Sequence, residues 1–441
     1  MRTLDFWKSR LTAVPSTIEC PEMRLLSGHD HEPPVFLGSG HIDITSLTTI
    51  DFTMFATPSD GSDAFRRLVR SRENPYEVFD QFRLVATDFD GTEWAGGWTR
   101  PEFKGIPKFG WPLTGKLSSL MTQATGPSVS QDSGVELVFQ PKLRLPMDKR
   151  MTATFSVDGE EIERRHSAGR NIVQVLNSEI KFFYTPSDDS LWVTAKTSDK
   201  LPHPYAENWI GEPLRVLLGQ LVFPRLVARN FGNGKAHISL RPSPPRLINS
   251  GIAALFQGEP VLDGKQFWEL YASLLTLIAE ARDGQGQPGF EAHKITRFYE
   301  ELIQATQGSR WVFCMTLAST AEAIARMLMS PDEQRSDFAE KDIQGLKDNV
   351  SAWKGDEKLR VRVMGDISRA GQRSIGKYLK DLVQRNVLED RHERSWSAVR
   401  NAVMHGNLVS PWATEEEDKR LLSLADLVHS LTRDLIRKGI R

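Results

Sequence analysis

The spacing of apolar residues changes along the chain near residue 246. Before this point, short alternating or β-branched runs recur at residues 41–54, 81–87, 135–139, 152–157, 180–184 and 191–195. Turn-forming groups such as Pro58-Ser59-Asp60-Gly61 and Asp158-Gly159 separate them. Alternation with period two and frequent turn residues are typical of half-buried strands. We therefore expect residues 1–246 to form a β-rich, sandwich-like region.

One short sequence occurs twice in this region. Phe55-Ala56-Thr57-Pro58-Ser59-Asp60 and Phe183-Tyr184-Thr185-Pro186-Ser187-Asp188 both end a strand-like run with the same Thr-Pro-Ser-Asp turn. Two duplicated lobes would explain the echo, and so would independent use of common turn residues. Both readings stay open.

Helical periodicity dominates the rest of the chain. The segment Arg241-Pro242-Ser243-Pro244-Pro245-Arg246 breaks regular structure. Apolar residues then recur at helical spacing within residues 267–278, 298–303, 312–328, 375–388, 393–405 and 415–438. We expect an α+β multidomain protein, with a helical connector at 247–290 and an all-α domain at 291–441. Thr414, followed by four acids, is the expected N-cap of the last helix.

Composition narrows the class of protein. No apolar stretch approaches the roughly 20 residues of a membrane-spanning helix. The two cysteines, Cys20 and Cys314, provide neither a disulfide framework nor a cysteine-rich metal site. We expect a cytoplasmic protein without membrane contact. A net charge of -1 argues against coating of nucleic acid by bulk electrostatics, so any nucleic-acid surface must be local.

The residues best suited to chemistry lie in the run Trp396-Ser397-Ala398-Val399-Arg400-Asn401-Ala402-Val403-Met404-His405-Gly406. A histidine exchanges protons near neutral pH, so His405 can act as a general base. Arg400 stays charged and can donate two hydrogen bonds to phosphate oxygens. Asn401 can orient the base or the substrate. These three are the candidate catalytic residues.

The spacing raises a geometric problem. Five residues on a regular helix turn Arg400 and His405 apart by about 140° and separate them by roughly 7.5 Å along the axis. Either the helix ends near Gly406, where a left-handed cap lets His405 turn, or a second copy of the motif completes the site across a two-fold axis.

The Arg-Asn-x3-His-Gly pattern, in a C-terminal helical region and followed by a long helix, resembles the signature of the HEPN superfamily. The resemblance implies a helical bundle that cleaves RNA without metal or other cofactor, and it implies a homodimer. The layout of a long β-rich part before such a bundle resembles the ApeA-type bacterial anti-phage proteins. It implies abortive-infection defence, RNA (perhaps tRNA) as substrate, and a phage-derived activator at the N-terminal region.

Further residues are expected near this site. Glu322, an acid among small and apolar residues, would tune His405 or hold Arg400, although a partly exposed helix acid is the commoner explanation. Residues 360–400 carry twice as many cations as acids, and a basic face there would hold RNA. From this stretch we select as candidate RNA contacts Lys377, Lys380, Arg391 and Arg394.

The alternatives are less specific. Arg400 would pair with an acid while Asn401 and His405 cap a helix, and the protein would be a non-catalytic sensor or scaffold whose β-rich part binds a protein or carbohydrate. His29-Asp30-His31-Glu32 has metal-ligand residue types but no third ligand by spacing, so we expect a solvated loop and no metal. Gly232-Asn233-Gly234 is expected to be a hairpin turn.

Overall fold

The computed structural model describes residues 2–28, 32–104, 111–147, 151–157, 160–166, 169–184, 189–257, 263–404 and 414–439. The chain separates into two compact units. Unit 1 comprises Met1–Gly211, Leu221–Arg246 and Gly258–Leu275, and unit 2 comprises Glu212–Gln220, Leu247–Gln257 and Thr276–Arg441. The helix α5 (Gly264–Glu280) contributes its first part to unit 1 and its last turn to unit 2. Together the two units are α+β, with the strands in the N-terminal part and most helices in the C-terminal part.

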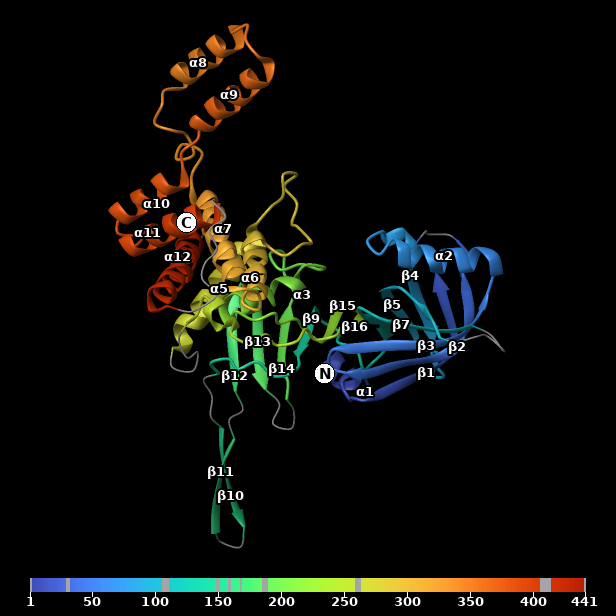
Figure 1. The fold of residues 1–441 in the computed structure, drawn as a ribbon. Coiled ribbons are helices and arrows are strands. Elements are labelled where there is room, and N and C mark those ends of the chain that lie inside the picture. Colours follow the sequence, from blue (N-terminus) through green and yellow to red (C-terminus); the bar gives the residue numbers. More distant parts are fainter. Residues whose placement is uncertain are drawn as a thin grey trace. The chain divides into compact units, whose positions relative to one another are not determined.

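Unit 1 is built on strands (Figure 1). They are β1 (Ser16–Leu26), β2 (Phe36–Ser46), β3 (Thr49–Pro58), β4 (Phe82–Thr87), β5 (Glu93–Thr99), β6 (Glu102–Phe103), β7 (Trp111–Lys116), β8 (Leu120–Thr125), β9 (Ser133–Phe139), β10 (Met151–Val157), β11 (Glu160–His166), β12 (Arg170–Val175), β13 (Ser178–Tyr184), β14 (Leu191–Lys196), β15 (Leu226–Gly232) and β16 (Lys235–Leu240). The helices of unit 1 are α1 (Thr3–Leu11), α2 (Gly61–Glu73), η1 (Val78–Asp80) and α3 (Ala206–Trp209).

Hydrogen bonding joins all but two of these strands in one 14-stranded sheet. Its order is β12-β13-β14-β9-β15-β16-β8-β5-β4-β1-β2-β3-β7-β6, and β10 and β11 form a separate hairpin. The sheet is antiparallel in its ladders, from Arg170↔Phe183 at the β12 end to Phe103↔Leu113 at the β6 end. The expected β-rich region is confirmed. The sandwich of two sheets is not found in the described part of the chain, because the β15–β16 hairpin bonds to β9 on one side and to β8 on the other.

Alternating burial along the chain explains the strand β3. In β3, Ile50, Phe52 and Met54 are buried, while Asp51 and Thr53 between them are partly exposed. Residues 41–54, expected as one run, form two strands, because the chain reverses after Ser46 and β2 pairs with β3. Elsewhere the expected hairpin turn is confirmed: Asn233 and Gly234 link β15 to β16 with φ of 56° and 67°. Glycine and asparagine tolerate this left-handed conformation.

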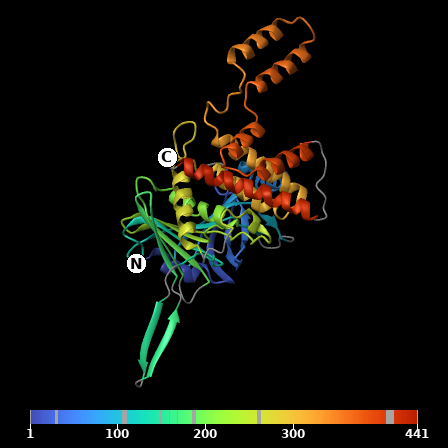
Figure 2. The same cartoon turned by 90° about the vertical axis from the view of Figure 1, so that its left-hand side faces the viewer.

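Unit 2 is helical. Its helices are α4 (Glu212–Leu218), η2 (Ser250–Ala253), α6 (Lys294–Ala305), α7 (Arg310–Leu328), α8 (Glu340–Ala352), α9 (Glu357–Ala370), α10 (Ile375–Gln384), α11 (Asp390–Met404) and α12 (Glu415–Gly439). Figure 2 shows α12 as one long, continuous helix. Its expected apolar stripe is buried, and the N-cap is confirmed by Thr414 Oγ1, which accepts a hydrogen bond from the Glu417 N–H at 3.2 Å.

The helices α8 and α9 form a pair that the apolar spacing did not predict. No residue of α8 is buried, and in α9 only Ile367 is. The chain segments that join this pair to the rest of unit 2 are bonded to each other. The Ser336 N–H donates to Gly371 O at 3.0 Å, and the Arg373 N–H donates to Gln334 O at 2.9 Å. The pair therefore begins and ends at one narrow neck.

Among the described residues, no helix is both long enough and apolar enough to cross a membrane.

Candidate functional site

Arg400 and Asn401 lie in the last turns of α11. This helix packs on α7 through a buried face that includes Trp396 and Val399, with 4% and 7% of their surfaces exposed. The indole Nε1 of Trp396 donates a hydrogen bond to Ala318 O of α7 at 3.2 Å. An aromatic residue buried with its polar atom satisfied fixes both the depth and the rotation of a helix. The position of Arg400 one turn further along is set by this anchor.

The guanidinium of Arg400 is held from two directions. Its Nε lies 3.6 Å from Oε2 of Glu322 on α7, and its Cζ lies 5.5 Å from the centroid of the Trp396 ring. The side chain is still 44% exposed. Neither terminal nitrogen, Nη1 nor Nη2, has a hydrogen-bond partner in the part of the chain that the structure describes. Ion pairing and cation–π contact thus orient the cation while its donor fork stays accessible.

Glu322 contacts a second cation. Its Oε1 accepts a hydrogen bond from Nη2 of Arg326 at 2.9 Å, one turn along α7, while Oε2 faces Arg400. The structure therefore brings together Glu322 and Arg400, which lie far apart in the sequence. Glu322 can therefore position Arg400.

The other two candidate catalytic residues differ in what the structure describes. Asn401 is exposed, directly after Arg400. His405 and Gly406 lie outside the described residues, since α11 is described to Met404 and the chain again from Thr414. The expected end of the helix near Gly406, and the pairing of His405 with Arg400, stay predictions.

Most of the expected RNA-contacting cations are in local ion pairs. Arg391 lies 2.7 Å from Glu389 and 3.1 Å from Asp426, and Arg394 lies 2.5 Å from Asp390. Lys377 pairs with Asp337. Lys380 is exposed on α10 and makes no ion pair with any described residue. Exposed pairs of this kind are weak and exchange readily, yet they reduce the positive potential that would attract RNA.

Two further residues of α11 matter to the site. Trp396 was overlooked as a partner of Arg400, although its position four residues earlier places both on one helix face. His392, 3% exposed, accepts a hydrogen bond at Nδ1 from the Glu389 N–H at 3.2 Å, and its buried Nε2 has no partner among the described residues. Burial lowers the pKa of His392, which keeps it neutral at the start of the helix. It acts as a structural cap.

Comparison with protein-family models, curated proteins and solved structures finds no match for this chain.

Proposed function

We propose that the protein is a metal-independent endoribonuclease of the HEPN type, with Arg400 and His405 as catalytic residues and Asn401 in support. One observation carries the proposal. A half-exposed arginine is held by Glu322 and Trp396, its terminal nitrogens bond to no residue that the structure describes, and Asn401 and His405 follow it one and five residues later. Fixing the side chain costs conformational entropy, and we infer that the arrangement serves a ligand.

The reaction follows from the chemistry of these groups. His405 takes the proton of a ribose 2′-hydroxyl, and the 2′-oxygen attacks the adjacent phosphorus. The bond to the 5′-oxygen of the next nucleotide breaks, and that oxygen takes up a proton as it leaves. The products are a 2′,3′-cyclic phosphate and a 5′-hydroxyl. Arg400 stabilises the charge that develops on the phosphate oxygens, and Asn401 orients the ribose or His405.

The setting of the reaction belongs to the same proposal. Two chains form a homodimer that brings both motifs to one cleft, which removes the angular problem between Arg400 and His405. The protein acts in the cytoplasm as an anti-phage effector that cleaves RNA, perhaps tRNA, when the N-terminal part receives a phage-derived signal. No metal or organic cofactor takes part in the proposed step.

A non-catalytic sensor or scaffold is the second candidate, and one observation favours it. The pairing of Arg400 with Glu322, together with the ion pairs of Lys377, Arg391 and Arg394, is also what a structural surface would show. The nuclease and the scaffold differ in whether the guanidinium of Arg400 binds a ligand or only stabilises the fold.

The test uses purified full-length protein and RNA labelled at one end, in buffer containing a chelator. The variants are His405→Ala, Arg400→Ala and Arg400→Lys, which keeps the charge and loses the fork. Arg326→Ala is the matched control, because Arg326 also pairs with Glu322. Fragments with cyclic phosphate ends that disappear in the first three variants and persist in the control support the nuclease. Equal cleavage, or none by any protein including that from phage-challenged cells, favours the scaffold.

A further inference from the structure

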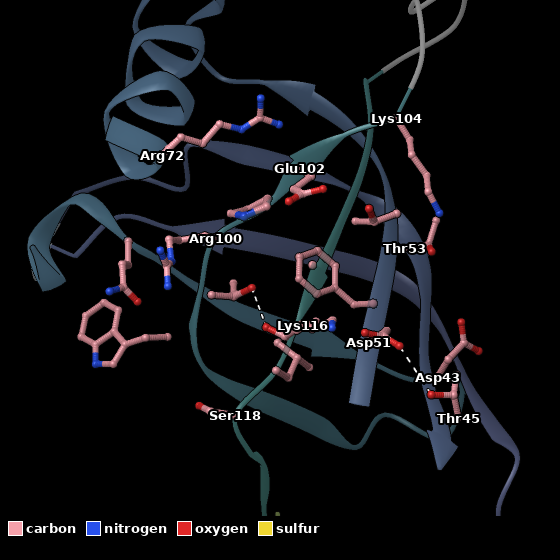
Figure 3. A pocket seen from close by; sticks show the side chains of 18 residues that line it. Asp43, Thr45, Asp51, Thr53, Arg72, Arg100, Glu102, Lys104, Lys116 and Ser118 are labelled. Carbon is pink, nitrogen blue, oxygen red and sulfur yellow. Dashed lines mark hydrogen bonds between the residues drawn. The ribbon is translucent and has the colours of Figure 1, made fainter. Parts of the chain in front are cut away.

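Unit 1 contains a hollow of about 920 Å³ on the polar side of strands β2, β3 and β7 (Figure 3). This volume lies within the range of small-molecule sites, roughly 300–1,000 Å³. We call it the polar hollow; the residues that line it include Asp43, Thr45, Asp51, Thr53, Arg72, Trp98, Thr99, Arg100, Glu102, Lys104, Thr114, Lys116 and Ser118. Nothing in the proposed RNA cleavage uses these residues.

The strand register sets the chemistry of the floor. Asp43 of β2 is directly opposite Asp51 of β3, which is directly opposite Lys116 of β7. The adjacent row places Thr53 opposite Thr114, and Thr114 opposite Glu102 of β6. Figure 3 shows that side chains from both rows face the same space. The floor therefore carries carboxylates, hydroxyls and an ammonium over four neighbouring strands, β2, β3, β7 and β6.

The two aspartates are placed at a cost to the fold. Like charges directly opposite each other on neighbouring strands are destabilising. Asp43 accepts a hydrogen bond from Thr17 Oγ1 at 2.7 Å and lies 3.2 Å from His41 Nε2, while Asp51 accepts one from Thr45 at 3.5 Å. No arginine or lysine among the described residues forms an ion pair with either carboxylate. Acids kept together without a paired cation are typical of a binding surface.

The rim adds donors from other elements. Arg72 comes from α2, Arg100 follows β5, and Lys104 follows β6. The side chains of these three cations and of Glu102 make no ion pair or hydrogen bond with a described residue. Trp98, 37% exposed, also borders the hollow. Arg83 lies 5.3 Å from the centroid of its ring.

We propose that the polar hollow binds a neutral, hydroxyl-rich ligand, an oligosaccharide. Sugar hydroxyls both donate and accept, so they can donate to Asp43, Asp51 and Glu102 and accept from Arg72, Arg100, Lys104 and Lys116. The threonine and serine hydroxyls of the wall do both. The apolar face of a sugar ring packs on the exposed part of the Trp98 indole, an amphipathic surface suited to it.

Two other ligand classes fit less well. The lining carries four cations and three carboxylates, so its net charge is small, whereas affinity for a phosphate chain such as RNA depends on a large excess of cations. A protein segment would need buried apolar anchors, which dominate such interfaces. Of the apolar side chains that line the hollow, Phe52, Pro101 and Leu117 are already buried. Only Trp98 is exposed and could contact a protein segment. The mixture of hydrogen-bond donors and acceptors therefore favours an oligosaccharide over RNA or a protein segment.

The test applies labelled full-length protein to an array that carries neutral oligosaccharides, heparin fragments, single-stranded RNA and peptides. Binding of a neutral oligosaccharide is expected. It should weaken at least about ten-fold in Asp51→Asn and in Lys116→Met, because a charged hydrogen bond contributes about that much affinity. Asp132→Asn is the control, an exposed acid of the same unit that pairs with Lys196.

Folding is monitored by the midpoint of thermal unfolding. Asp51→Asn removes the repulsion from Asp43 and the attraction to Lys116 together, so its midpoint should change little, and weaker binding cannot then be ascribed to unfolding. Failure to bind any neutral oligosaccharide, binding that both floor variants retain, or binding to heparin, RNA or peptides alone would each overturn the proposal. RNA cleavage is unaffected by any of these results, so the two proposals fail separately.

Discussion

Acidification should destabilise unit 2 through a buried imidazole. His429 of α12 is 1% exposed. Its Nε2 donates to Ile252 O at 3.1 Å, and its Nδ1 lies 2.9 Å from the hydroxyl oxygen of Tyr299, which donates to Thr432 Oγ1. Burial, aided by the nearby charge of Arg433, lowers the pKa of His429 to about 4. A second proton would place a charge in the core.

The sign and size follow from proton linkage. The unfolded chain binds a proton near pH 6.5 and the folded chain only near pH 4. The full stability of this site is therefore present above pH 6.5 and is lost as the pH falls towards 4. From pH 7.5 to 5.0, His429 alone should lower the free energy of unfolding by about 2 kcal/mol. Burial also lowers the pKa of His293, the N-cap of α6, to about 4, so it adds a loss of the same sign.

The assay is hydrogen exchange of peptides from α12 at both pH values, corrected for intrinsic rates. His429→Gln should be less stable at pH 7.5 by about 1–3 kcal/mol, because the buried hydrogen bond of the imidazole to Ile252 O is lost. Its loss on acidification should be smaller than that of the natural protein by about 2 kcal/mol. His237→Gln, in unit 1, is the control and should leave the α12 response unchanged. Equal pH responses in the natural protein and His429→Gln would refute the reasoning.

Three further predictions concern the two sites and one turn. Glu322→Gln should change the free energy of unfolding by less than about 1 kcal/mol, because the ion pair with the half-exposed Arg400 is weak. The same substitution should lower RNA cleavage several-fold. A parallel loss of stability and cleavage would make Glu322 purely structural. Asp51→Asn should change the stability of unit 1 by less than about 1 kcal/mol in urea unfolding, because relief of repulsion from Asp43 offsets the lost attraction to Lys116, and a larger change would contradict that reading. Asn233→Val should cost roughly 1–2 kcal/mol in the same assay, since valine resists a φ of 56°; an unchanged midpoint would show that the turn rearranges freely.

Local patterns in the sequence predicted those elements whose signal repeats over several turns. The stripe of α12 is an example, since Leu424, Val428 and Leu431 are all buried. The reversal between β2 and β3 was not predicted, because Leu47 and Thr48 at the turn are neither glycine nor proline. The helices α8 and α9 were not predicted, because they have almost no buried residues and therefore no regular apolar spacing.

Contacts between residues far apart in the sequence limited how much of the sheet and of the candidate site could be predicted. The bonding of β9 to β14 and β15 depends on contacts across many residues, which no local pattern contains. At the candidate site, the sequence placed Arg400 and Asn401 on a helix and suggested Glu322 as a neighbour. It did not show that Trp396 would lie against Arg400. The Asp43–Asp51–Lys116 row needed the strand register before it could be recognised at all.

The narrow neck of the α8–α9 pair has a consequence for how this protein can vary. The backbone before and after the pair is already joined by the bonds Ser336–Gly371 and Gln334–Arg373, so the ends of the insertion are neighbours. A single deletion of the intervening segment, closed by a short turn, would leave the packed helices of unit 2 intact, since Ile367 is the only buried residue removed from the two helices. Lineages can gain, lose or exchange this pair in one genetic event, and engineers can use the same neck to graft a reporter or a foreign binding module.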